Sequence, residues 1–253
     1  GLILFAGVTG SGKSTSIAAM LNYVNQRKRC HIVTIEDPIE YIFTDSKATI
    51  NQREVGIDCL SFDEALRALV REDPDVVLVG EMRDYVTFES AIRAAETGHL
   101  VFGTIHASSA WQTFGRIYDL FPEGERAQIR KLLAYNLRAI VYQKLLPTLR
   151  EDTPRIPALE ILLNTPIVTK YILEGREGEL LDDRRPSSPM ISNALVGIST
   201  RAGAQRSTPE GRESIMPRTH FGLLGGAIVA NRPNPRNVMS LPIIRLYIRV
   251  RIK

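Results

Sequence analysis

A glycine-rich loop near the start of the chain has the residue types and spacing that suit phosphate binding. The segment Gly7–Ser14 reads GVTGSGKS and fits the pattern GxxxxGK[ST]. Its glycines allow successive backbone N–H groups to point at one phosphate, and the amino end of a following helix adds its positive dipole. Lys13 is expected to reach the β- and γ-phosphates, and Ser14 to ligate Mg²⁺. Because an apolar run precedes the loop and a helical pattern follows it, nucleotide binding is favoured over a chance glycine-rich turn.

A group of carboxylates follows the next apolar run. Glu36, Asp37 and Glu40 come directly after residues 31–35, so we expect them at the carboxyl edge of a sheet, where open α/β sheets bind ligands. Carboxylates there can hold Mg²⁺ through water or polarise an attacking water. A solvated acidic turn set by Pro38 is the alternative, and position alone weighs the two equally.

Glu81 is expected at the same edge. It follows the apolar run 75–79 with Gly80 between them. Many phosphate-loop enzymes place a magnesium-binding Asp where Gly80 stands, so Mg²⁺ should rely on Ser14 and on water-bridged carboxylates such as Glu81. We expect Glu81 to orient the hydrolytic water; the alternative is a surface Glu at a strand end.

Two histidines bracket a further apolar run. His99 and His106 flank residues 100–104. An imidazole at the exit of this strand could sense a γ-phosphate or pass a signal to a neighbouring subunit, and a purely structural role is the alternative. Zinc is not expected, because the histidines lack a paired Cys or third His nearby and Cys30 and Cys59 lack CxxC spacing. Two isolated cysteines favour a reducing compartment.

These residues must be positioned by a sheet and its helices. Short β-branched runs alternate with longer helical patterns, which is typical of an α/β fold with a mostly parallel sheet. A helix over 61–71 is predicted to begin at a capping box of Ser61 and Glu64 and to end before Pro74. The predicted strands are 2–6, 31–35, 75–79 and 100–104, and the further predicted helices are 86–97, ending at Gly98, and 125–142.

The composition of the chain excludes several classes of protein. The chain has 253 residues, of which 44% are apolar and 24% charged, and this excludes a disordered or fibrous protein. No uninterrupted apolar stretch approaches the roughly 18 residues that a membrane-spanning helix needs. The chain begins with Gly1 in place of Met and enters an apolar strand at once, so we interpret it as a fragment that starts inside a core strand.

Charge divides the chain near residue 181. Residues 1–181 carry 20 Lys and Arg against 24 Asp and Glu, whereas residues 182–253 carry 12 against 4 and hold 7 of the 14 prolines. One hypothesis for this basic tail is a reading-frame shift in the source gene. The other, ranked second, is a genuine basic segment in which residues 244–253 alternate apolar and cationic side chains, as a strand with one cationic face would.

Five motifs in order resemble the secretion ATPase superfamily, and within it the type IV pilus retraction branch of PilT-like motors. They are GVTGSGKST, TIEDPIEY, NQREVG, LVREDPDVVLVGEMRD and AAETGHLVFGTIHASSA, all within residues 1–173. The resemblance implies a RecA-like P-loop NTPase core that acts as a homo-hexamer. It also implies ATP hydrolysis at subunit interfaces that drives pilus disassembly for twitching motility. The implied location is cytoplasmic and peripheral to the inner membrane.

The same resemblance implies a division of the chain and a set of partners. Residues 1–143 correspond to the RecA-like ATPase core and 144–181 to the start of a carboxy-terminal segment, with a short helical segment expected after the core. The family pattern stops near residue 182, and 182–253 are the atypical basic tail. The implied partners are other copies of the chain and the pilus platform protein of the inner membrane, with no nucleic acid. ATP and Mg²⁺ are the implied cofactors.

Individual roles follow by position from this resemblance. Glu36–Glu40 matches the aspartate box with Glu40 as its catalytic carboxylate, Glu81 matches the Walker B glutamate, and His99 and His106 match the histidine box. The implied catalytic residues are thus Glu81, Glu40 and His106. The implied Walker A residues are Gly7, Thr9, Gly10, Ser11, Gly12, Lys13, Ser14 and Thr15. Arg53, Arg67, Arg71 and Arg83 are candidates for phosphate contacts, with salt bridges to Glu72, Asp73 or Asp84 as the alternative.

The sequence also departs from the family pattern. No tetracysteine element follows Leu145–Pro147, which favours retraction over the assembly and type II secretion ATPases. We expect the amino-terminal domain of the family to be missing from this chain. Ala107 stands where the family has Thr, and segment 165–171 lacks the arginine of the corresponding motif. A non-hydrolysing, nucleotide-dependent ring subunit is therefore the alternative of another class, and a small-molecule kinase ranks well below it.

Overall fold

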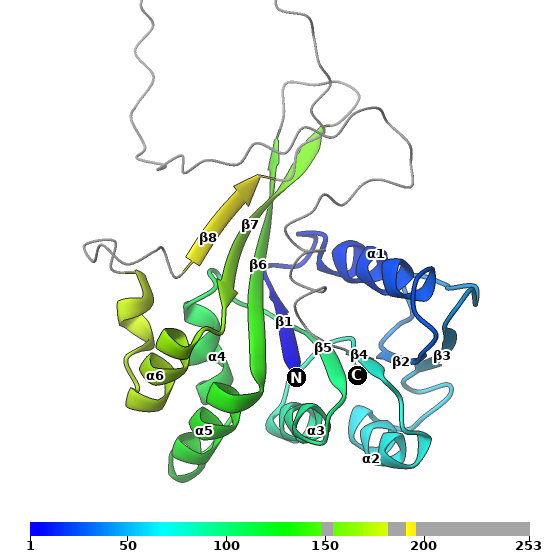
Figure 1. Cartoon of the computed structure of the whole chain (residues 1–253), viewed down its shortest axis with the longest axis horizontal. Coiled ribbons are helices and arrows are strands. Elements are labelled where there is room, and N and C mark those ends of the chain that lie inside the picture. The colour runs from blue at the N-terminus through cyan, green and yellow to red at the C-terminus, as the bar shows by residue number, and fades with distance from the viewer. Residues whose placement is uncertain (148–153, 182–190, 196–253) are drawn as a thin grey trace, which may run out of the picture.

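The structure is a computed structural model that describes residues 1–147, 154–181 and 191–195. In this part of the chain, eight strands form one sheet in the order β3-β2-β4-β5-β1-β6-β7-β8 (Figure 1). Neighbours from β3 to β6 pair in parallel, whereas β7 is antiparallel to β6 and β8 is antiparallel to β7. The strands are β1 (Leu2–Ala6), β2 (His31–Glu36), β3 (Thr49–Glu54), β4 (Val76–Val79), β5 (Leu100–Ile105), β6 (Leu137–Pro147), β7 (Arg155–Leu163) and β8 (Ile191–Leu195).

Helices cover both faces of this sheet, because alternate residues of each central strand point to opposite sides. On one face α1 packs on Ile3 and Phe5 of β1, and on the other face the remaining helices pack on Leu2 and Leu4 (Figure 1). The α/β fold with a mostly parallel sheet is confirmed. The helices are α1 (Lys13–Asn25), α2 (Phe62–Glu72), α3 (Tyr85–Glu96), α4 (Gln112–Asp119), α5 (Arg126–Asn136) and α6 (Pro166–Glu174), with 3-10 turns at Glu123–Glu125 and Glu177–Leu181.

Two predicted helices form within one residue of their expected bounds. The hydroxyl of Ser61 accepts from the backbone N–H of Glu64 and so caps α2. The carboxylate of Glu64 accepts from the N–H of Leu60 instead of Ser61, so the capping box is only half formed. Helix α3 ends before Gly98, whose φ of +112° lies in the region that favours glycine.

The predicted helix over residues 125–142 is wrong in its last third. Helix α5 ends at Asn136, and the chain continues as strand β6 from Leu137. Strand β6 pairs in parallel with β1, and Leu137, Ala139 and Val141 are buried. A strand that is buried on both faces reads as a continuous apolar run, which apolar periodicity does not distinguish from a helix.

Strand β6 runs through residue 143, where we placed the end of the ATPase core. It forms an antiparallel pair with β7, so residues 144–147 and 155–163 extend the same sheet before α6 begins. The division at residue 143 stays a prediction. Of the predicted basic tail, the structure describes only β8, and the strand proposed over 244–253 lies outside the described residues.

The described residues include no helix that is long and apolar enough to cross a membrane.

Phe88 is a sensitive position in the core, because its fully buried ring packs edge-on against Phe121 at a centroid distance of 5.9 Å. We expect Phe88→Ala to lower the free energy of unfolding by about 3–5 kcal/mol, the usual cost of removing a buried phenyl ring. Urea denaturation followed by circular dichroism measures this change. Ile42→Ala, at a side chain that is 91% exposed, should change it by less than about 0.5 kcal/mol. Equal effects of the two substitutions would contradict the packing described here.

Candidate functional site

The glycine-rich loop connects β1 to α1 and adopts a conformation that only glycine tolerates at its ends. Gly7 has a φ of +148° and Gly12, the N-cap residue that precedes α1, a φ of +83°. A Cβ atom on Gly7 would lie 2.5 Å from the backbone oxygen of Gln143, and one on Gly12 would lie 2.9 Å from Gln143 Nε2. The sequence thus places glycine where both the backbone angle and a close neighbour require it.

Lys13 lies back over this loop. Its Nζ donates to the carbonyl oxygens of Gly7 at 2.9 Å and Val8 at 3.0 Å. Burial lowers the pKa of Lys13, while the nearby carboxylates of Glu81 and Glu40 oppose that shift. The ammonium group is therefore held at the mouth of the loop, where an anionic ligand can replace the two carbonyl oxygens.

Glu81 is held from both sides at the end of β4. His106 Nε2 lies 2.8 Å from one carboxylate oxygen, and the Arg83 guanidinium lies 2.6 Å from the other. Partial burial alone would raise the pKa of Glu81, but the hydrogen bond and charge of Arg83, together with His106 and Lys13, outweigh it, so the pKa is lowered. An ionised, oriented carboxylate is what the activation of a water requires.

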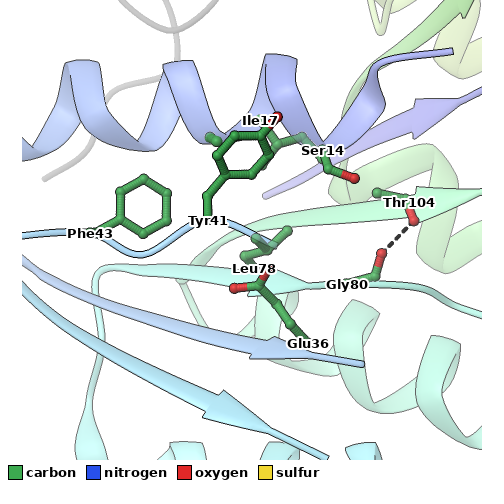
Figure 2. A pocket seen from close by; sticks show the side chains of 9 residues that line it. Ser14, Ile17, Glu36, Tyr41, Phe43, Leu78, Gly80 and Thr104 are labelled. Carbon is green, nitrogen blue, oxygen red and sulfur yellow. Dashed lines mark hydrogen bonds between the residues drawn. The ribbon is translucent and has the colours of Figure 1, made fainter. Parts of the chain in front are cut away.

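A small cavity of about 30 Å³ lies between α1 and the ends of β2, β4 and β5 (Figure 2). Ser14, Glu36 and Thr104 line it, and the Thr104 hydroxyl donates to the backbone oxygen of Gly80. Glu36 is buried and accepts from Thr34 at 2.7 Å, and burial raises its pKa. Mg²⁺ prefers oxygen ligands, so the hydroxyl and carboxylate oxygens here fit the predicted cation.

The other two carboxylates of the acidic segment are exposed. Asp37 lies near Arg83, whose pKa it helps to raise. Glu40 lies close enough to Lys13 to act on its charge. Next to Glu40, the Tyr41 hydroxyl lies 2.7 Å from the Thr15 hydroxyl, which joins the acidic segment to the first turn of α1.

The structure separates the two predicted histidines. His106 follows the carboxyl end of β5 beside Glu81, whereas His99 precedes its amino end, on the opposite edge of the sheet from the loop. His99 Nδ1 lies 2.9 Å from the Ala94 oxygen, and the His99 carbonyl accepts from the Gly1 amino group at 2.6 Å. Within one chain His99 therefore has structural contacts only, and His106 alone of the pair belongs to the site.

Three of the four candidate arginines form local ion pairs. Arg53 pairs with Glu72 at 2.6 Å, which is the alternative that the sequence left open. The other two pairs involve different carboxylates: Arg67 pairs with Asp63 at 2.8 Å, and Arg83 pairs with Glu81. Arg71 is exposed on the last turn of α2.

Sequence reasoning missed Gln143. This residue of β6 is 2% exposed, and its Nε2 donates to the Ser11 carbonyl at 2.7 Å while its Oε1 accepts from the Ser16 hydroxyl at 2.7 Å. It thereby braces the loop and the first turn of α1 together. The sequence around it, Tyr142-Gln143-Lys144, carries no local signal for this role. The role appears only once β6 is known to be a strand, because a buried polar side chain must find partners.

The chain matches the family model described as "Type II/IV secretion system protein" over residues 1–196. It is 49% identical over 180 residues to a type IV pilus retraction ATPase, PilT, of Pseudomonas aeruginosa, covering 71% of this chain and 52% of that protein. It is 50% identical over 176 residues to a twitching motility protein of Neisseria gonorrhoeae, covering 70% of this chain and 47% of that protein.

A solved structure agrees with these relatives. A pilus retraction motor PilT with bound ADP superposes with a TM-score of 0.68 at 52% identity, covering 71% of this chain and 52% of that one. The chain thus spans about half the length of the relatives that it matches.

Removing the amide of Gln143 tests whether its hydrogen bonds stabilise the glycine-rich loop. We expect Gln143→Met, which keeps the length of the side chain, to lower the free energy of unfolding by about 1–3 kcal/mol, because a buried carbonyl and a hydroxyl lose their partners. The loop loses preorganisation, so affinity for a fluorescent ATP analogue should fall about tenfold in a titration. Gln128→Met, on the exposed face of α5, is the matched control and should leave both quantities unchanged. If Gln143→Met binds the ATP analogue as tightly as the unsubstituted chain, Gln143 does not preorganise the loop.

Proposed function

Since the chain belongs to the type II/IV secretion system protein family, we propose that it is the ATP-hydrolysing core of a type IV pilus retraction motor. The observation that carries this proposal is the meeting of Lys13, Glu81 and His106 at one edge of the sheet. An edge that joins a phosphate-binding loop to an oriented carboxylate can bind a nucleoside triphosphate and direct water at it. Identities near 50% to PilT and to a twitching motility protein support the retraction type.

In the proposed reaction each side chain has a separate task. Lys13 exchanges the carbonyls of Gly7 and Val8 for the β- and γ-phosphates of ATP and neutralises their charge. Glu81 accepts a hydrogen bond from the attacking water and aligns it. His106 and Arg83 each hold one oxygen of Glu81, which fixes the direction in which it accepts.

Mg²⁺ fits the Ser14 end of the small cavity, where it would neutralise charge on the phosphates. Ser14 would hold the ion directly, and Glu36 and Glu81 through water. Glu40 is the second carboxylate that we assign to the catalytic edge, and its negative charge acts on Lys13.

The assembly and location of the motor are part of the same proposal. We expect a homo-hexamer with its nucleotide sites at subunit interfaces, placed on the cytoplasmic side of the inner membrane against a platform protein of the pilus. The relatives named as pilus motors support this arrangement. An assembly or type II secretion ATPase is the alternative within the family.

A non-hydrolysing ring subunit is the alternative of another class. It is favoured by Ala107, which follows His106 and removes a hydroxyl that the family pattern has at this point. Such a subunit would bind ATP and assemble in response to it without turnover.

We expect Glu81→Gln to bind ATP with unchanged affinity and to lose at least about 100-fold in turnover, because an amide cannot accept the water proton as a carboxylate does. Phosphate release and titration of a fluorescent ATP analogue measure the two quantities. Glu123→Gln, on an exposed turn, is the control and should hydrolyse ATP at the unsubstituted rate. If the unsubstituted chain binds ATP and oligomerises without releasing phosphate, the motor proposal fails and the ring subunit is favoured.

A further inference from the structure

The segment between β2 and β3 carries functional residues without secondary structure of its own. This acidic loop, residues 37–48, contains Glu40 and Tyr41 and includes no helix or strand. Backbone hydrogen bonds from Lys47 and Ala48 to the Asn25 carbonyl hold its end near β3. The part around Glu40 needs side-chain contacts if its residues are to keep a defined direction. The contacts that hold its part around Glu40 include three from the motif NQREVG, to which the proposed reaction gives no role.

Two side chains of β3 form hydrogen bonds with the backbone of the acidic loop at every second residue. Gln52 donates from Nε2 to the Tyr41 carbonyl at 2.8 Å and accepts at Oε1 from the Phe43 N–H at 2.9 Å. Glu54 accepts from the Ile39 N–H at 3.0 Å. Strand β3 is the outermost strand on this side of the sheet. Side-chain hydrogen bonds from β3 therefore hold the loop in the place where a further strand would form backbone hydrogen bonds.

Other contacts fix the far end of the loop. The fully buried side chain of Asn25, at the end of α1, donates to the Thr44 carbonyl at 2.8 Å and accepts from the Ser46 N–H at 3.0 Å. Asp45 accepts from the Ile50 N–H at 3.0 Å. The end of the loop near β3 is thus anchored independently of Gln52, so a change at Gln52 should act on the part around Glu40.

The hydrogen bonds of Gln52 hold residues that lie at the catalytic edge of the sheet. The Tyr41 carbonyl that Gln52 holds belongs to the residue whose hydroxyl meets Thr15 on α1 (Figure 2 shows Tyr41 beside this helix). Glu40 immediately precedes it and lies within electrostatic reach of Lys13. Both polar atoms of the Gln52 amide contact the loop, and Nε2 also makes a second, longer contact of 3.4 Å to Glu36 at the end of β2.

We propose that Gln52 and Glu54 are positioning residues that hold the acidic loop along the edge of the sheet and thereby direct Glu40 at the bound nucleotide. This inference rests on the proposed ATP hydrolysis, because Glu40 acts on the nucleotide only there. Neither residue touches the reacting atoms; both act through the backbone of the loop.

The test compares Gln52→Met with Asn51→Thr in the full chain. Methionine keeps the length of the side chain and removes both hydrogen bonds to the loop, whereas Asn51 is exposed on the same strand and its Oδ1 lies 3.2 Å from His31 Nε2, outside the loop. In hydrogen–deuterium exchange, we expect peptides that cover residues 39–43 to exchange at least about tenfold faster in Gln52→Met, with the α1 peptides unchanged. In steady-state kinetics, kcat should fall at least about tenfold while KM for ATP changes less than about twofold.

A double substitution shows whether Gln52 acts through Glu40. In a Glu40→Gln background, Gln52→Met should cause no further loss of kcat, because the group that it positions is already gone. Unchanged exchange of residues 39–43, or unchanged kcat in Gln52→Met, would overturn the proposal. So would equal losses of kcat with and without Glu40. Failure of the proposed function is a different result, since the unsubstituted chain and Asn51→Thr would then both release no phosphate.

Discussion

Parallel pairing of the central strands is the constraint on which the rest of the site depends. Because β1, β2, β4 and β5 run in the same direction, the segments that leave their carboxyl ends emerge at one edge. Four stretches that are distant in sequence thereby bring a lysine, several carboxylates and a histidine together. The same constraint explains why His99, one strand length from His106, lies outside the site.

Much of the fold and of the candidate site could be predicted from the sequence, because short local patterns indicate them. Four strands, two helices and the phosphate-binding loop each have a signal within about a dozen residues. The edge that collects Glu36, Glu40, Glu81 and His106 follows from those strands once they are taken as parallel. Fold class and family membership were accessible for the same reason.

What could not be predicted depends on contacts across the chain. Strand β6 was taken for helix, because burial on both faces removes the alternation that marks a strand. With β6 misassigned, Gln143 had no reason to meet Ser11, which lies 132 positions earlier. The partners of the arginines are also set by the tertiary structure: Arg53 of β3 meets Glu72 at the end of α2, 19 positions later in the sequence.

Because Gln143 contacts the glycine-rich loop, the conformation of that loop depends on the register of β6. Its neighbours along the strand are Tyr142 and Lys144, whose side chains leave the opposite face of the sheet. Sliding the strand by a single residue would bring an aromatic ring or a cation against the carbonyl of Ser11. An insertion or deletion between Leu137 and Gln143 should therefore weaken phosphate binding even though no residue of the loop itself has changed.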